Sequence, residues 1–404
     1  MVRDDGTHAD AAAIRWVKVQ DGAPGPRMRP VLDGARVALC HEWTMQMAGS
    51  ERVAGAIAAV VRPDAVFTLG AKPQVAARVF PESEVWVPRF GLNRTVQRHW
   101  HQLLLLFHAA WASLTLKRFD VVITSSHSCV NAVRTGGRPY LLSYCHTPMR
   151  YAWAWQEERS RVPPVLRPIW PTAAAGLRAI DRRVSRKVDT FIANSAFIAE
   201  RISHAYGASS TVVHPPVDTS FYTPPTSPAG TSDDYVLFAG RTVGYKRPDI
   251  AVEAARRAGV PIVVAGSGPL IEDLRLGGAD GASFVEQPSD AQLRELYRGA
   301  RALVSPGVED FGITNVEAMA CGTPVLAYDR GGARDSVIPG RSGMLVKEQT
   351  AAAFAQAMRE LPRSWDVEAC REVAEGFSER AFDERIAAVL AGIGTRGPRD
   401  DVRD

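Results

Sequence analysis

The sequence alternates short apolar segments with stretches long enough to form helices, and it does so in two halves of a 404-residue chain. Buried strands of parallel sheets are continuous apolar runs, and crossover helices join them. In the first half such runs lie at residues 35–40, 66–69, 120–124, 140–144 and 190–193. In the second half they lie at 235–239, 261–265, 302–305 and 324–327, with helices expected over 249–258, 290–299 and 315–320. The pattern predicts an α/β protein with two Rossmann-like β/α/β domains.

A proline-rich stretch separates the two halves. Five prolines occur within residues 215–234, which is typical of a linker. The chain is also longer than one hydrophobic core usually serves. We therefore expect a disordered tail (1–34), an N-terminal domain (35–215), a linker (216–234), a C-terminal domain (235–365), C-terminal helices (366–395) and a second tail (396–404). A cleft between the domains is the expected binding site.

Composition places the chain among soluble globular proteins, because 46% of its residues are apolar and 23% are charged. The five cysteines are odd in number and scattered, so we expect reduced thiols and neither a zinc site nor a disulfide framework. The first twenty residues contain acids and no uninterrupted apolar core, which does not resemble a secretory signal. We therefore expect a cytoplasmic protein.

Positive charge is concentrated in one part of the sequence. Residues 85–156 hold eight arginines or lysines and a single acid, Asp120, so this segment carries +7 and the rest of the chain −3 of the total +4. Such asymmetry favours an anionic partner. We expect an anionic membrane surface and no nucleic acid, since no recognised nucleic-acid motif is present.

Within this segment, residues 94–116 predict one long helix that contains the apolar run 103–107 and Trp111. Polar residues interrupt the run at His101, Gln102 and His108, which argues against a membrane span. Two alternatives remain: a helix packed in the core, or an interfacial helix on an anionic bilayer. The second would use the flanking cations Arg94, Arg98, Lys117 and Arg118.

Two carboxylates, Glu309 and Glu317, bracket a short loop at the expected start of a helix. Free backbone amides at a helix start suit a diphosphate, and a glycine in the loop allows close approach. Carboxylates accept hydrogen bonds from sugar hydroxyls. A capping box from Thr314 to Glu317 is the structural alternative for Glu317, whereas Glu309 has none. The loop residues predicted to bind such a ligand are Phe311, Gly312, Ile313 and Thr314.

Cations for a diphosphate follow the first strand of the second half. Arg241 offers a planar fork and Lys246 a point charge, and together they can neutralise phosphate oxygens. Gly266 and Gly268 close the next strand, where they form either a turn open to a nucleotide or a plain turn. They are not a full dinucleotide fingerprint, because Ile271 replaces the third glycine.

In the first half, residues 144–153 follow a strand end and read Tyr-Cys-His-Thr-Pro-Met-Arg-Tyr-Ala-Trp. His146 could act there as an electrophile, a hydrogen-bond donor or a base, beside aromatic residues suited to sugars. The chain contains no Asp-x-Asp triplet and no clustered metal ligands. We therefore expect no metal and no cofactor, with cations and amides stabilising the leaving group.

These motifs resemble the retaining glycosyltransferases of family 4, which have the two-domain GT-B fold, over residues 35–392. The most specific matches are the Glu-x7-Glu stretch from Glu309, the Gly240-Arg241-x4-Lys246 motif and the segment around His146. The resemblance implies that Arg241 and Lys246 hold the donor diphosphate, Glu309 the sugar hydroxyls and Glu317 the ribose. It also implies phosphate-loop roles for Gly49 and Ser50, a place for His146 beside the anomeric carbon, and a last helix that crosses back to the first domain.

The segment around His146 is most similar to bacterial mannosyltransferases that use GDP-mannose to build envelope polysaccharides. The resemblance implies front-side transfer with retention to a lipid-linked saccharide or glycan acceptor, on the inner face of the plasma membrane. The sequence departs from the family at Ala154, where aspartate is frequent, and at Ala48, where a glycine is usual.

Several alternatives stay open. A UDP-hexose could be the donor, with a small-molecule or glycolipid acceptor. A nucleotide-sugar epimerase or a glycoside phosphorylase shares the two-domain architecture. A hydride-transferring Rossmann enzyme is disfavoured by the missing third glycine, and a non-catalytic sugar-binding module would tolerate loss of Glu309 and Lys246.

Overall fold

The computed structural model describes residues 14–22, 31–99, 103–137, 139–154, 167–168, 170–226, 235–277, 281–362 and 364–393. The chain divides into two compact units: unit 1 comprises residues 1–213 and 383–404, and unit 2 comprises residues 214–382. Helix α15 (Glu379–Ala391) begins in unit 2 and continues in unit 1. Within the described ranges, every helix is too short or too polar to cross a bilayer.

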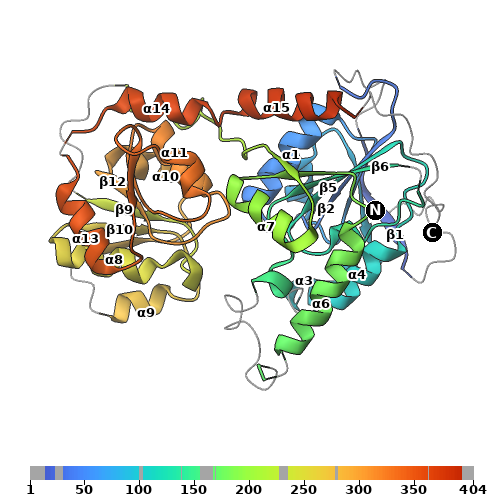
Figure 1. Ribbon diagram of the computed structural model, residues 1–404, viewed down its shortest axis with the longest axis horizontal. Helices are drawn as coiled ribbons and strands as arrows, with labels where there is room; N and C mark the ends of the chain where they lie inside the picture. The colour runs from blue at the N-terminus through green and yellow to red at the C-terminus, as the bar shows by residue number, and fades with distance from the viewer. Residues whose placement is uncertain are drawn as a thin grey trace. The chain divides into compact units, whose positions relative to one another are not determined.

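Unit 1 contains an eight-stranded sheet with the order β1-β4-β3-β2-β5-β6-β7-β8 (Figure 1). All neighbouring strands are parallel except β1 and β4. The strands are β1 (Trp16–Gln20), β2 (Val37–His41), β3 (Ala65–Thr68), β4 (Glu84–Pro88), β5 (Val121–Ser126), β6 (Tyr140–Cys145), β7 (Thr190–Ala193) and β8 (Ser210–Val212). The helices include α1 (Gly49–Val61), α2 (Pro73–Val79), α3 (Arg94–His99), α4 (Leu104–Ser113), α5 (Arg150–Trp153), α6 (Trp170–Ser185) and α7 (Ala196–Tyr206).

The N-terminal segment carries a strand that sequence reasoning missed. Strand β1 pairs antiparallel with β4, and Trp16 is only 6% exposed, with its ring 5.8 Å from Phe67 and 5.4 Å from Trp111. The prediction of a tail without structure over residues 1–34 is therefore wrong for Trp16–Gln20. Burial of one large aromatic ring and the pairing of a sheet edge stabilise a strand whose polar, glycine-containing surroundings hide it in the sequence.

The predicted long helix over residues 94–116 is also wrong as a single element. The structure has the separate helices α3 and α4, and Leu103 between them has a non-helical backbone (φ −104°, ψ 25°). In α4 the side chains of Phe107, Ala110 and Trp111 are buried in the core of unit 1. Of the two alternatives, α4 is thus a core-packing helix; Gln102 and His101 lie outside the described residues.

Unit 2 contains a six-stranded, fully parallel sheet with the order β11-β10-β9-β12-β13-β14. Its strands are β9 (Val236–Ala239), β10 (Ile262–Ala265), β11 (Ala282–Val285), β12 (Ala302–Ser305), β13 (Val325–Tyr328) and β14 (Gly343–Val346). Its helices are α8 (Pro248–Ala258), α9 (Ile271–Leu276), α10 (Asp290–Gly299), α11 (Ile313–Ala320), α12 (Ala333–Ser336), α13 (Ala351–Glu360) and α14 (Val367–Glu375), with a 3₁₀ turn, η6 (Gly244–Lys246).

Side chains alternate between the two faces of this sheet, so unit 2 has two hydrophobic layers. Val236 and Phe238 face the layer that holds α8 and α13, whereas Leu237 and Ala239 face the layer that holds α10, α11 and α14. Figure 1 shows α8 and α13 lying on one side of β9 and β10, with α10 and α11 on the other. The prediction of Rossmann-like domains with parallel sheets covered by helices is confirmed.

Candidate functional site

The structure brings Lys246 and Glu309 into direct contact in unit 2. Lys246 ends the turn after β9, and Glu309 lies in the loop after β12, the neighbouring strand. The Lys246 Nζ donates to both carboxylate oxygens of Glu309, at 3.0 Å to Oε1 and 2.9 Å to Oε2. Both side chains are mostly buried, at 11% and 20% exposure. Carboxyl ends of adjacent parallel strands thus unite two residues that are far apart in sequence.

The pair is coupled to further positive charge. Burial lowers the pKa of Lys246, but the charge and hydrogen bonding of Glu309, together with Tyr245, outweigh burial, so the net pKa is raised and the ammonium stays charged. Arg241 acts in the opposite direction on that pKa, which shows that its positive field reaches Lys246. The Arg241 guanidinium is exposed and donates from Nη2 to the Tyr245 hydroxyl at 3.1 Å. Two cations at one strand end can bind phosphate oxygens.

Helix α11 begins directly beside this pair. Gly312 is its N-cap and has φ 90°, a conformation that favours glycine, so the predicted helix start near Asn315 lies two residues too late. The first amides of a helix have no acceptor within it, so Ile313 and Thr314 add donors for an anion. The side chain of Phe311 is 3% exposed and packs on His214 and Phe377, so only its backbone could meet a ligand.

Glu317 lies deeper in the same helix. Its side chain is 4% exposed and accepts a hydrogen bond from the Tyr297 hydroxyl at 2.9 Å. The capping box suggested by Thr314 and Glu317 is not formed, because Gly312 is the N-cap and no side chain caps the helix. The tyrosine of α10 fixes the orientation of the carboxylate instead.

Gly266 and Gly268 lie where the loop after β10 meets the loop after β9. A Cβ atom on Gly266 would come within 2.0 Å of the Gly240 carbonyl oxygen, and one on Gly268 within 2.7 Å of Thr242. The close packing of these two loops by itself explains why both positions are glycine. The buried Thr242 hydroxyl lacks a hydrogen-bond partner among the described residues, so a polar group remains available there.

Three glycines that sequence reasoning missed hold the Lys246–Glu309 pair in place. A Cβ on Gly307 would lie 2.6 Å from Lys246 Cα, one on Gly331 2.5 Å from the Glu309 carbonyl oxygen, and one on Gly332 2.3 Å from Phe311 Cα. The signal that could have found them is the Gly331-Gly332 pair shortly after a strand end. Glycine permits close backbone approach of this kind, which brings the loops that carry Lys246 and Glu309 together.

In unit 1, His146 lies at the carboxyl edge of the sheet with two other histidines. The Ser125 hydroxyl is 2.9 Å from His146 Nε2 and 3.0 Å from His41 Nδ1. The His127 ring lies 6.0 Å from that of His146 and 6.2 Å from that of His41. These residues come from the ends of β2, β5 and β6, which are neighbours in the sheet. Neither His41 nor Ser125 was predicted, although both stand at a strand end.

Burial keeps this cluster uncharged. Desolvation lowers the pKa of His146 to about 3 and that of His41 to about 4, and it lowers the pKa of His127 well below its ordinary value. Imidazoles in this state donate or accept single hydrogen bonds and carry no charge at neutral pH. His146 is therefore unsuited to general acid–base catalysis near pH 7. It can still form hydrogen bonds to a ligand.

The predicted phosphate loop at Gly49 and Ser50 is helical. Both residues belong to the first turn of α1, where Ala48 is the N-cap and no side chain caps the helix. The Ser50 hydroxyl donates to Glu51 at 2.8 Å, and burial raises the pKa of Glu51 to about 7. The loop interpretation is wrong, but a helix start still presents amides.

A second buried carboxylate, Glu42, was also missed. It is 0% exposed and accepts hydrogen bonds from the amides of Ser128 and Val130, each at 2.9 Å. Burial raises its pKa to about 7, and the amide bonds oppose that rise. These bonds connect the loops after β2 and β5, so Glu42 positions the segment that carries His127.

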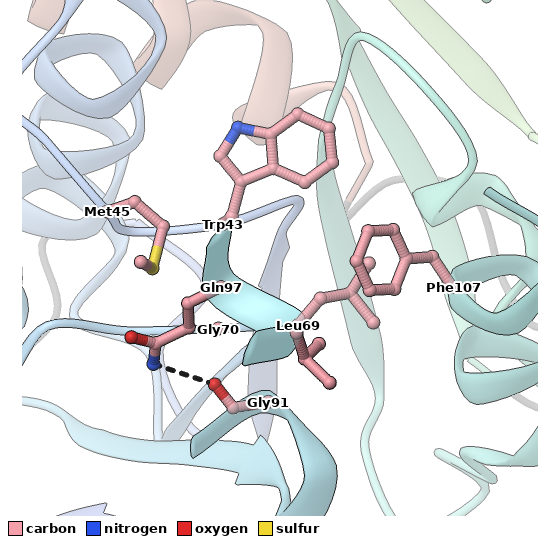
Figure 2. A pocket seen from close by; sticks show the side chains of 8 residues that line it. Trp43, Met45, Leu69, Gly70, Gly91, Gln97 and Phe107 are labelled. Atoms are coloured by element: carbon pink, nitrogen blue, oxygen red, sulfur yellow. Dashed lines mark hydrogen bonds between the residues drawn. The ribbon is translucent and has the colours of Figure 1, made fainter. Parts of the chain in front are cut away.

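A small apolar pocket lies beside the histidine cluster in unit 1 (Figure 2). Trp43, Met45 and Phe107 line it, and the Gln97 amide donates to the Gly91 carbonyl at 2.9 Å. Its volume is about 20 Å³, which is enough for one water-sized group. The pocket stands at the ends of β2 and β3 and is completed by Leu69, Gly70, Gly91 and Val96.

The basic segment does not form one surface. Lys117 and Arg118 precede β5, and the backbone of Arg134 pairs with that of Leu116 next to them, so these three lie toward the amino ends of the strands. Arg89 and Arg94 follow β4 and Arg150 follows β6, at the carboxyl ends. Arg138 and the side chain of Arg98 lie outside the described residues. The concentration of charge in sequence is thus divided between opposite edges of the sheet.

Two further features bear on metals and on the departures from the family pattern. In the part of the chain that the structure describes, no three His, Cys, Asp or Glu side chains form a group that could hold a metal ion. Ala154 is buried at 5% exposure and ends α5. Its neighbour Trp153 donates from Nε1 to the buried Asp181 at 2.7 Å, so the aromatic ring is oriented by α6.

Comparison with known proteins assigns both units. The family model described as Glycosyltransferase Family 4 matches residues 53–221, and the model described as Glycosyl transferases group 1 matches residues 224–381. The chain is 34% identical over 253 residues to D-inositol 3-phosphate glycosyltransferase of Gordonia bronchialis, covering 54% of this chain and 55% of that protein. Its counterpart in Geodermatophilus obscurus is 35% identical over 244 residues. The matched region thus spans about half the length of these relatives.

Solved structures share the fold. Anabaena HepE in complex with UDP and glucose has a TM-score of 0.65 at 18% identity, covering 88% of this chain and all of that one. Sucrose-phosphate synthase from Thermosynechococcus elongatus has a TM-score of 0.67 at 19% identity, covering 89% and 99%. The two family models together match residues 53–221 and 224–381, and the solved structures share the fold. The chain therefore belongs to the GT-B glycosyltransferases of family 4 and group 1.

Proposed function

We propose that the protein transfers a hexose, with retention of anomeric configuration, from a nucleoside diphosphate sugar to a saccharide acceptor. The observation that carries this proposal is the contact between Lys246 and Glu309 at the start of α11. It places a buried ammonium, a carboxylate and helix amides within one loop cluster. Such a set complements a sugar diphosphate, which presents hydroxyls and anionic oxygens side by side.

In the proposed reaction, Lys246 and Arg241 stabilise the charge that develops on the leaving diphosphate. Glu309 accepts hydrogen bonds from donor-sugar hydroxyls, and Glu317 from the ribose. The amides of Gly312, Ile313 and Thr314 bind phosphate or sugar oxygens. The loop of Gly266 and Gly268 and the first turn of α1, at Gly49 and Ser50, border the nucleotide. The leaving diphosphate accepts the acceptor proton in a front-side displacement, so no covalent nucleophile and no metal are required.

For the donor, we propose GDP-mannose first, because the segment around His146 resembles bacterial mannosyltransferases. A UDP-hexose is the second candidate, supported by the structural similarity to HepE, which was solved in complex with UDP and glucose. For the acceptor, we propose a lipid-linked saccharide or glycan of the cell envelope. D-inositol 3-phosphate is the second candidate, because it appears in the names of relatives at 34% and 35% identity.

The donor is tested by incubating the purified protein with GDP-mannose, UDP-glucose or UDP-N-acetylglucosamine and measuring release of GDP or UDP and thermal stabilisation. NAD⁺ serves as a control ligand. Stabilisation and turnover with one sugar nucleotide are expected. Stabilisation by NAD⁺ alone, or by none of the four, would overturn the proposal. With the donor known, product analysis with D-inositol 3-phosphate and with lipid-linked saccharides decides between the acceptors, and intact sugar transfer excludes an epimerase.

We also propose peripheral binding to the cytoplasmic face of an anionic membrane, through Arg89, Arg94 and Arg150. Binding energy of this kind is about 1 kcal/mol for each basic residue near the surface and falls with salt. Flotation with vesicles that contain anionic lipid should recover the protein at low salt, and neutral vesicles should not. Equal recovery with both vesicle types, or none with either, would contradict this part of the proposal.

A further inference from the structure

The histidine cluster of unit 1 contains a chain of three side chains linked through one hydroxyl group. His41 Nδ1 lies 3.0 Å from Ser125 Oγ, and Ser125 Oγ lies 2.9 Å from His146 Nε2. His41 and Ser125 are 0% exposed and His146 is 9% exposed. The geometry is built into the sheet, because His41 and Ser125 are register partners on β2 and β5, and His146 directly follows β6.

Proton counting restricts this chain to two states. The serine hydroxyl has one proton and could accept from both imidazoles. Its own proton would then be a buried donor without an acceptor among the described residues, because His41 and His146 are its two partners there. Ser125 therefore donates to one imidazole nitrogen and accepts from the other. In one state His41 Nδ1–H donates to Ser125, which donates to His146 Nε2, and His146 carries its proton on Nδ1. In the other state every bond is reversed, and His146 presents an unprotonated Nδ1. The tautomers of His41 and His146 are therefore coupled.

The surroundings of His41 select between the two states. Its Nε2 is buried and lacks a hydrogen-bond partner among the described residues. In the reversed state this nitrogen would carry a proton, and a buried N–H group without an acceptor is costly and rare in folded proteins. In the first state it carries only a lone pair. The cost of an unpaired donor thus favours the state in which His41 donates to Ser125.

We infer that His41 and Ser125 are positioning residues that hold His146 as the Nδ1–H tautomer, so that His146 offers a hydrogen-bond donor to an oxygen of the transferred sugar. The contact with the sugar rests on the proposed function, whereas the tautomer does not. His146 Nε2 is engaged by Ser125, so Nδ1 is the nitrogen left for a ligand. His146 acts in this role as a neutral donor and not as a base.

The tautomer can be measured without any substrate. In ¹⁵N-labelled full-length protein at pH 7, the two ring nitrogens of His146 are assigned by comparison with the His146→Gln variant. A protonated Nδ1 and an unprotonated Nε2 are expected, and in Ser125→Ala the preference should be lost. The exposed His204 is the internal reference. A protonated Nε2 on His146 in the wild-type protein would overturn the inference, whatever reaction the protein catalyses.

Kinetics separate positioning from folding. An asparagine at residue 41 keeps an N–H donor near the position of Nδ1, whereas leucine removes it. His41→Leu and Ser125→Ala should lower kcat about 10 to 100-fold with the donor KM within about twofold, and His41→Asn should recover most of the loss. Equal losses in His41→Asn and His41→Leu at matched melting temperatures would overturn the positioning role. Absence of transfer by the wild-type protein with every donor would refute the proposed function but leave the tautomer measurement valid.

Discussion

The two units use the same kind of position, the carboxyl ends of adjacent parallel strands, but they treat charge in opposite ways. In unit 2 a buried lysine keeps its proton because Glu309 pairs with it, and Arg241 stands beside them. In unit 1 burial keeps His41, His127 and His146 neutral. The architecture therefore does not dictate the chemistry of the strand ends; the side chains placed there do.

This difference assigns different tasks to the two units. A charged pair with helix amides is suited to anionic oxygens, where the gain is large because charge develops there during the reaction. A neutral, hydrogen-bonded cluster is suited to orienting a hydroxyl-bearing ligand without adding charge. Loss of the charged pair in unit 2 should therefore cost more activity than loss of the neutral donor in unit 1.

Removal of the charge in unit 2 should have the largest effect. Lys246→Ala deletes a cation that stabilises the leaving group and leaves Glu309 unpaired, so kcat/KM should fall about 1000-fold. Arg275→Ala is the matched control, because Arg275 forms exposed ion pairs with Glu272 and Glu286 in the same unit. Initial rates of nucleotide release measure both variants. A loss of similar size in the control would show that ion pairing in unit 2 matters only for folding.

Removal of the neutral donor in unit 1 should have a smaller effect. His146→Phe keeps an aromatic ring but deletes the hydrogen bonds, so kcat should fall about 100-fold, in the range of a single lost donor to the reacting sugar. His204→Phe, an exposed histidine of the same unit, is the control. Steady-state kinetics with saturating donor decide the outcome. Full activity of His146→Phe would contradict a role for unit 1 in catalysis.

The neutral histidines should also make stability depend on pH. The folded pKa of His41, about 4, lies below its unfolded value of about 6.5. Its contribution is therefore complete above pH 6.5 and is lost as the pH falls toward 4. The destabilisation caused by His41→Asn should shrink by up to about 1.4 kcal/mol per pH unit over this range. Urea unfolding at several pH values tests it.

The buried carboxylate Glu42 of unit 1 should make stability depend on pH in the opposite direction to the histidines. The folded pKa of Glu42, about 7, lies above its unfolded value of about 4.5. Its contribution is complete below pH 4.5 and is lost as the pH rises through 7. A His41→Asn difference that grows on acidification would contradict the assignment of a neutral cluster.

The smallest effect is expected for the hydrogen bond that orients Glu317. Tyr297→Phe removes the hydroxyl that donates to this carboxylate, and it should lower the free energy of unfolding by about 1 to 2 kcal/mol. Tyr235→Phe, which loses a bond to the Leu296 carbonyl, is the matched variant. If Glu317 binds the ribose, only Tyr297→Phe should also raise the donor KM. Equal donor KM values in both variants would limit Glu317 to a structural role.

The sequence was informative where physical constraints are local. Apolar runs such as residues 120–124 located central strands such as β5 (Val121–Ser126), and the alternation predicted parallel sheets. Strand β1 was missed because its stability comes from the distant Trp111 and from β4, which no local pattern displays. The helix predicted over 94–116 was too long because periodicity does not reveal the non-helical backbone of Leu103.

The site shows the same limit. Lys246 and Glu309 could be chosen from their places after strands, but their direct contact depends on the order of strands in the sheet and on close approach at Gly307 and Gly331. His41 and Ser125 offered no motif at all. They become visible only when β2, β5 and β6 are adjacent, because the hydroxyl that joins the two imidazoles comes from a third strand.

The central claim is that unit 2 binds a nucleoside diphosphate sugar through Lys246. Isothermal titration of GDP-mannose and UDP-glucose into the wild-type protein and Lys246→Ala, with Arg275→Ala alongside, tests it most directly. One of the two donors should bind the wild-type protein and Arg275→Ala equally. In Lys246→Ala its Kd should rise about 100-fold, corresponding to about 2.7 kcal/mol. Equal affinity in Lys246→Ala, or no binding of either donor to the wild-type protein, would contradict the claim.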